Sequence, residues 1–140
     1  MGSRRQSREF ALQALYLCDI CKFDLERSLQ TVFKDSPSES TKVFCEHLVR
    51  GTITKMSEID QILKRYAENW DIQRMAIIDR NVLRLAAFEI LTDFDTPVSV
   101  IIDEAIEIAK NFSTQDSGKF VNGILDKVKL ERKEPPRTKD

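Results

Sequence analysis

The chain has 140 residues, of which 41% are hydrophobic and 32% are charged, and its formal net charge is −1. This size fits one ordinary domain with a buried core, and the near-neutral balance provides no overall basic field that would by itself indicate nucleic-acid binding. The absence of a long apolar stretch, of a signal-peptide pattern and of an even set of cysteines predicts a cytoplasmic protein without a membrane span.

A first helix is predicted over residues 4–21, because its apolar residues recur with the spacing of one buried stripe. Its first turns carry Arg4, Arg5 and Arg8, so residues 1–8 have a local charge of +3. Cations are unfavourable at this end of a helix, where the dipole is already positive. The cluster is better explained as an anion site, in which guanidinium groups and free backbone N–H groups point together.

Six more helices are predicted, joined by short polar loops, over residues 25–33, 40–55, 57–69, 73–91, 97–112 and 117–128. Asp24, Asp71 and either Asp116 or Ser117 have the side chains expected of helix caps. The helix at 73–91 is apolar on more than half of its circumference, which predicts a central position. Seven short helices of this kind indicate an all-α, antiparallel helical bundle.

The pattern Cys18-x-x-Cys21 with Cys45 and His47 resembles a set of zinc ligands. However, residues two apart on a helix point to nearly opposite sides, so Cys45 and His47 would not converge on one ion. No glycine-rich phosphate loop is present, and no nucleophile stands beside a base in sequence. We therefore expect no metal, no cofactor and no catalysis.

The last predicted helix begins with polar residues that could contact RNA. Lys119 can meet a phosphate, Asn122 can contact a base edge, and an exposed Phe120 could stack on an unpaired base. The spacing alone favours the other interpretation, a capped helix with Phe120 in the core. Residues 127–140 carry another +3, which leaves −7 on the body of the chain and favours a basic protein partner.

Four segments, in order, resemble the NusB family of bacterial transcription antitermination proteins. They are the arginine-rich opening that runs into Ala14-Leu15-Tyr16, the helix segment at 78–89, the segment at 96–110 and the string Ser117-Gly118-Lys119-Phe120-Val121-Asn122-Gly123. This resemblance implies two small antiparallel helical bundles, at residues 1–70 and 71–131. The polar, proline-containing residues 132–140 are expected to form a mobile tail.

The resemblance also implies a function: binding of boxA-type single-stranded RNA together with NusE, a ribosomal small-subunit protein, and action on the elongating RNA polymerase complex at ribosomal RNA operons. The RNA contacts carried over by motif position are Arg4, Arg5, Arg8, Tyr16, Asp116, Lys119, Phe120 and Asn122. The contacts expected for NusE are Asp79, Arg80, Arg84 and Glu89.

The chain departs from the family pattern in its short basic start and in Gly118, which replaces a larger polar residue. Two other functions stay open at this point: a helical protein–protein adaptor that does not bind RNA, and the RNA-recognition module of a ribosomal RNA methyltransferase. A homodimer that hides the arginine surface is a further open question. The RNA-binding hypothesis requires the start of the first helix and the polar edge of the last to share a solvent-facing surface.

Overall fold

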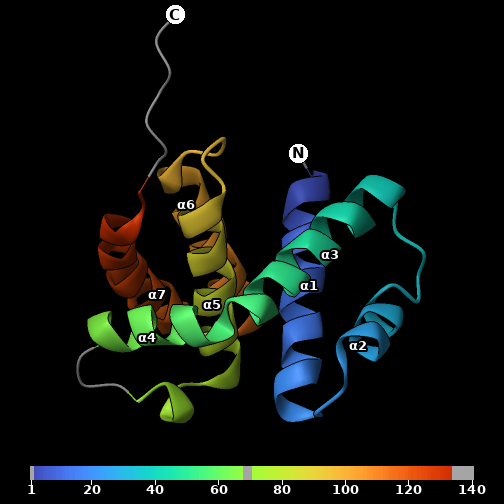
Figure 1. Cartoon of the computed structure of the whole chain (residues 1–140), viewed down its shortest axis with the longest axis horizontal. Coiled ribbons are helices and arrows are strands. Elements are labelled where there is room, and N and C mark those ends of the chain that lie inside the picture. Colours follow the sequence, from blue (N-terminus) through green and yellow to red (C-terminus); the bar gives the residue numbers. More distant parts are fainter. Residues whose placement is uncertain (1, 68–70, 134–140) are drawn as a thin grey trace, which may run out of the picture.

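The structure is a computed structural model that describes residues 2–67 and 71–133, and within these ranges every regular element is a helix (Figure 1). The elements are α1 (Gly2–Ile20), α2 (Leu25–Val32), α3 (Glu39–Thr54), α4 (Met56–Tyr66), η1 (Ile72–Arg74), α5 (Ile77–Thr92), α6 (Val98–Phe112), α7 (Gln115–Val128) and η2 (Lys129–Glu131). The prediction of an all-α protein with seven α-helices is confirmed for this part of the chain. In the same ranges, none of the helices combines the length and apolar character needed to cross a bilayer.

The helix starts show where the sequence pattern located the caps correctly and where it did not. Asp24 caps α2 as predicted, and its Oδ1 accepts a hydrogen bond of 2.8 Å from the Arg27 N–H. Asp71 caps only the short helix η1, and α5 begins later than predicted, at Ile77. The cap of α7 is Thr114, three residues before Ser117, with which it forms a capping box.

Helix α5 lies at the centre of the molecule. Every residue from Asp79 to Ile90 is buried, so neighbours cover α5 on all sides, as its apolar circumference predicted. Helices α1, α3, α4, α6 and α7 all pack against it. Side chains that carry function must therefore come from the helices around α5 or from its ends.

The helices lie in two groups. Figure 1 shows α1–α3 on the right and α4–α7 on the left, and α4 packs against α3, α5 and α7. The division into bundles at residues 1–70 and 71–131 stays a prediction. One hydrophobic core runs through both groups.

The predicted tail begins with a residue that the structure holds in place. Arg132 lies over the Phe94 ring at 5.0 Å and donates a 3.2 Å hydrogen bond to the carbonyl oxygen of Thr96. Residue 132 is thus anchored against the start of α6. Residues 134–140 lie outside the described part of the chain, so the prediction of a mobile tail stays a prediction there.

Two glycines allow helices to approach closely. A Cβ on Gly51 would lie 2.1 Å from Cζ of Phe88, so α3 crosses α5 directly over this ring. A Cβ on Gly118 would lie 2.9 Å from the Lys110 side chain and 3.3 Å from Ile106. Glycine at 118 therefore lets α7 pack closely against α6, and this contact explains why a larger residue is absent.

Candidate nucleic-acid interface

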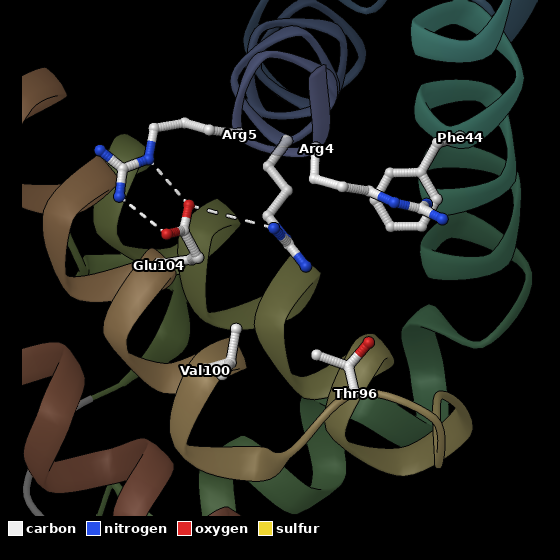
Figure 2. A pocket seen from close by; sticks show the side chains of 7 residues that line it. Arg4, Arg5, Phe44, Thr96, Val100 and Glu104 are labelled. Atoms are coloured by element: carbon white, nitrogen blue, oxygen red, sulfur yellow. Dashed lines mark hydrogen bonds and ion pairs between the residues drawn. The ribbon is translucent and has the colours of Figure 1, made fainter. Parts of the chain in front are cut away.

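The three arginines of α1 have three different environments, although they lie within five residues of one another. Arg4 is exposed, and its guanidinium carbon lies 3.7 Å above the ring of Phe44 on α3 (Figure 2). This is a cation–π contact in which the flat guanidinium group covers one face of the ring. Among the described residues, no ion pair involves Arg4.

Arg5 is half-buried and forms a two-pronged ion pair with Glu104 of α6. Its Nε and Nη2 donate hydrogen bonds of 2.8 and 2.7 Å to the two carboxylate oxygens (Figure 2). These bonds hold the pKa of Glu104 below its ordinary value. The pair stays partly accessible to solvent, with 41% of the Arg5 side chain exposed.

Arg8 is buried and forms the same kind of fork with Glu89 of α5. The two hydrogen bonds measure 2.8 and 2.9 Å, and the two side chains are 7% and 3% exposed. Arg8 was expected to contact phosphate, but its donors point into the core and are taken by a carboxylate. Arg8 neutralises Glu89 and connects α1 to α5, and its contact with RNA stays a prediction.

The three arginines meet at a cavity of about 530 Å³ between α1, α3 and the start of α6. Its lining is Arg4, Arg5, Arg8, Phe44, Thr96, Val100 and Glu104. Figure 2 shows Glu104 on one side of this space and the Arg4–Phe44 stack on the other. A cavity with guanidinium groups and an aromatic ring in its walls can accept a phosphate beside an unpaired base.

The polar face of α7 presents three of the four residues predicted from this helix. Asp116, Lys119 and Asn122 are exposed, and their spacing places them on one side of α7. Phe120 is only half-exposed and packs against the hydrophobic core. The exposed stacking position considered for Phe120 is therefore not observed.

The predicted residues fall into two groups at opposite ends of α6. Thr96 and Val100 line the arginine cavity at the start of α6, whereas α7 begins just after its end. Tyr16 lies near that second end, where it and Phe112 line an apolar hollow of about 360 Å³. Because α6 has 15 residues, its ends are about 20 Å apart. The arginines and the α7 residues thus do not form one compact site.

Comparisons with known proteins identify the family. The NusB family model matches residues 5–130. The chain belongs to the NusB family. A transcription antitermination protein NusB from Elusimicrobium minutum is 45% identical over 136 residues, which cover 95% of this chain and 97% of the relative. The corresponding protein of Desulforapulum autotrophicum is 44% identical, with 93% of each chain covered.

Solved structures of NusB proteins share the fold. T. maritima NusB has a TM-score of 0.86 and 42% sequence identity, with 92% of each chain covered. A structure described as antitermination factors NusB and NusE in complex with dsRNA has a TM-score of 0.86 and 23% identity, over 94% of this chain and 98% of that one. The latter likeness shows the fold alone. Membership of this family assigns the chain to transcription antitermination and not to an enzyme class.

The residues expected to bind NusE lie inside this NusB protein. Asp79, Arg80, Arg84 and Glu89 are only 8%, 6%, 7% and 2% exposed. Arg80 forms a fork with Asp19 of α1 at 2.7 and 2.8 Å, and Arg84 forms one with Asp60 of α4 at 2.9 Å for both bonds. Arg80, Arg84 and Glu89 thus join helices within the chain, and a contact of these residues or of Asp79 with NusE stays a prediction.

The cysteines occupy separate environments. Cys18 Sγ lies 3.2 Å from Ser28 Oγ, Cys21 is exposed, and burial raises the pKa of the Cys45 thiol to about 12. His47 is exposed beside Phe44. Among the described residues, no three His, Cys, Asp or Glu side chains are grouped to hold a metal ion.

The sequence reasoning did not identify Glu104 or Phe44 as parts of the site. In the sequence, Glu104 is one of several acids in its segment, and Phe44 is one apolar residue of its helix. Their partners Arg5 and Arg4 lie 99 and 40 positions away, and local periodicity carries no signal for pairs so distant.

Proposed function

We propose that this NusB-family protein binds boxA-type single-stranded RNA together with NusE, and acts in the cytoplasm on elongating RNA polymerase at ribosomal RNA operons. The observation that carries this proposal is the cavity at the start of α1, where Arg4 and Arg5 keep solvent-accessible guanidinium groups beside Phe44. The relatives' name supports the role in antitermination. The fold shared with a complex of NusB, NusE and dsRNA supports the partners.

The arginines provide the part of the affinity that depends least on RNA sequence. Arg4 and Arg5 are assigned to phosphates, which fix the position of a strand and make its affinity depend on salt. Arg8 is assigned an indirect part: its Nη1 lies 4.0 Å from Glu104, so it helps to hold this carboxylate beside Arg5. Two exposed arginines give weak binding at physiological salt, so a partner that adds RNA-binding surface is needed for tight binding.

The face of α7 and Tyr16 provide contacts at the other end of α6. Lys119 is assigned to a phosphate and Asn122 to a base edge, with Asp116 on the same exposed side and Phe120 packed behind it. Tyr16 is 36% exposed and offers a ring for stacking. An extended single strand that follows α6 would contact both groups, which a compact ligand would not.

The decisive experiment is a gel shift with boxA-type RNA, with and without NusE. We expect weak binding by the protein alone and tight binding by the complex. The Arg4→Ala/Arg5→Ala variant should lose RNA but still co-purify with NusE, whereas Arg50→Ala, at an exposed ion-paired arginine of α3, should bind both.

The same experiment separates this proposal from its alternatives. Co-purification with NusE without any RNA shift would favour a protein–protein adaptor. Loss of both partners in the double variant would contradict separate surfaces for RNA and protein. Gel filtration of the free protein decides whether it forms a homodimer. The relatives carry the antitermination name and are matched over nearly their whole length, which favours this function over a methyltransferase module.

A further inference from the structure

We propose that Arg4 and Phe44, with His47 beside them, form a stacking site for one unpaired RNA base on the surface shared by α1 and α3. This inference rests on the proposed function and adds to it a base-binding position outside the α7 face and the phosphate-binding arginines. It also assigns Arg4 a second role, because a flat guanidinium group can hold a base as well as a phosphate.

A series of ring contacts, tilted between Phe88 and His47 and stacked between His47 and Phe44, leads from the core to the surface. The His47 ring lies 5.5 Å from the Phe88 ring of α5, centroid to centroid. The Phe44 and His47 centroids are 6.3 Å apart, with the ring planes inclined by 29°. The Arg4 guanidinium lies 3.7 Å above Phe44, with its flat group over the ring (Figure 2). Packing beneath therefore fixes the plane on which a base would lie.

Space for a base exists on both sides of this stack. Arg4 and Phe44 line the 530 Å³ cavity that contains Arg5 and Glu104. They also line a second cavity of about 780 Å³ on the α3 side, together with Ser7, Glu39, Ser40, Val43 and His47. Arg4 and Phe44 thus separate a basic hollow, suited to phosphate, from a hollow in which Val43, Phe44 and His47 stand beside the polar residues Ser7, Glu39 and Ser40.

Two further features favour a base as the occupant. Val43 is 60% exposed in the wall of the second cavity, which leaves apolar surface beside the aromatic rings. Arg4 also differs from Arg5 and Arg8, whose donors are taken by carboxylates. Within the described ranges Arg4 forms no ion pair, so its N–H groups can bind a phosphate while its plane stacks.

A second arginine–phenylalanine stack provides a matched control. The Arg27 guanidinium also lies 3.7 Å from a ring centroid, that of Phe23. Arg27 is exposed on α2, where the acidic residues Asp24 and Glu26 are its neighbours in sequence and repel a nucleic-acid backbone. The two stacks have the same local chemistry, and only the first borders the arginine cavity.

The test compares Arg4→Lys with Arg27→Lys in RNA titrations in the presence of NusE. Lysine keeps the charge and the phosphate contact but has no plane to stack. We expect Arg4→Lys to weaken binding about 5-fold or more, within the range measured for one stacked base, with an unchanged salt dependence. Arg27→Lys should bind like the wild type. Equal affinities of Arg4→Lys and wild type would overturn the stacking site.

A second readout detects the base itself. We place 2-aminopurine at each position of the boxA-type RNA in turn and expect one position to be quenched in the wild-type complex. Phe44→Leu, which keeps an apolar side chain, should restore fluorescence at that position, with its fold checked by circular dichroism. Quenching that is identical in Phe44→Leu would overturn the assignment. Wild-type protein that binds no RNA with NusE would overturn the proposed function as well, whereas normal binding with unaffected variants overturns only this site.

Discussion

Two groups of arginines, one in the core and one at the surface, have different roles. Arg80 and Arg84 of α5 are each fully engaged by carboxylates from α1 and α4, with side chains 8% exposed. Arg4 and Arg5 of α1 lie at a cavity open to solvent, and Arg5 keeps 41% of its side chain exposed. A guanidinium buried with its carboxylate supports the fold, whereas one at the surface can exchange its carboxylate for a phosphate. Arg8, although it belongs to the α1 group in sequence, behaves like the first kind.

The largest effect is expected from removing the shared carboxylate of the α5 network. Asp19→Ala should lower the free energy of unfolding by about 4 kcal/mol, because it leaves the buried charge of Arg80 without its carboxylate. Urea unfolding measures this change. Glu46→Ala, which breaks an exposed ion pair with Arg50, is the control and should leave the free energy of unfolding nearly unchanged. Similar losses in both variants would show that burial does not distinguish the pairs.

The second prediction separates the structural role of Arg8 from the RNA-binding role of Arg5. Arg8→Ala should lower the free energy of unfolding by about 3 kcal/mol, because it leaves the buried carboxylate of Glu89 without its partner. Arg5→Ala should cost less than about 1 kcal/mol, because its ion pair is partly solvated, yet it should weaken RNA binding. Urea unfolding and RNA titration of the same samples test both statements. If Arg8→Ala were as stable as wild type, Arg8 would not be a structural residue.

The third prediction concerns the free energy of unfolding at acidic pH. Hydrogen bonds from Arg80 hold the pKa of Asp19 in the folded protein below its ordinary value of 3.8. The carboxylate therefore contributes stability above that value and loses it as the pH falls through the depressed folded pKa. Wild-type stability should decline below about pH 4, and Asp19→Asn should show a shallower decline over the same range. Parallel curves from urea unfolding between neutral and acidic pH would contradict this role.

The smallest effect is expected at Glu104. Glu104→Gln removes the anion that occupies Arg5, so RNA phosphate no longer has to displace it. The affinity for boxA-type RNA with NusE should rise a few-fold at low salt, as measured by RNA titration. Weaker binding by Glu104→Gln would instead mean that Glu104 holds Arg5 in its binding position.

The sequence predicted the helices well and the long-range pairs poorly. Apolar periodicity and the Asp24 cap are local signals, and the helices they predicted start and end close to those observed. The prediction that a helix begins at residue 73 was wrong, because the apolar stripe continues across residues 73–76, where η1 ends and the backbone turns at Met75. Charge alone could not separate Arg4 from Arg8, since only the fold decides that Glu89 lies opposite Arg8 and Phe44 opposite Arg4.

The residues expected to bind NusE show the same limit of prediction from sequence. Asp79, Arg80 and Arg84 are polar residues in an apolar helix, a pattern that suits either a docking surface or a buried ion-pair network. Distinguishing the two requires the positions of Asp19 and Asp60, which come from other helices. Motif resemblance could locate these residues along the chain but could not indicate which way they point.

The salt dependence of RNA binding tests most directly whether the two accessible arginines of α1 hold the phosphate backbone. The affinity of the complex with NusE for boxA-type RNA is measured at a series of salt concentrations for wild type and for Arg4→Ala/Arg5→Ala. Loss of two phosphate contacts should flatten the slope of log affinity against log salt by about 1.4. An unchanged slope would contradict the account, because the strand would then be held by charges elsewhere.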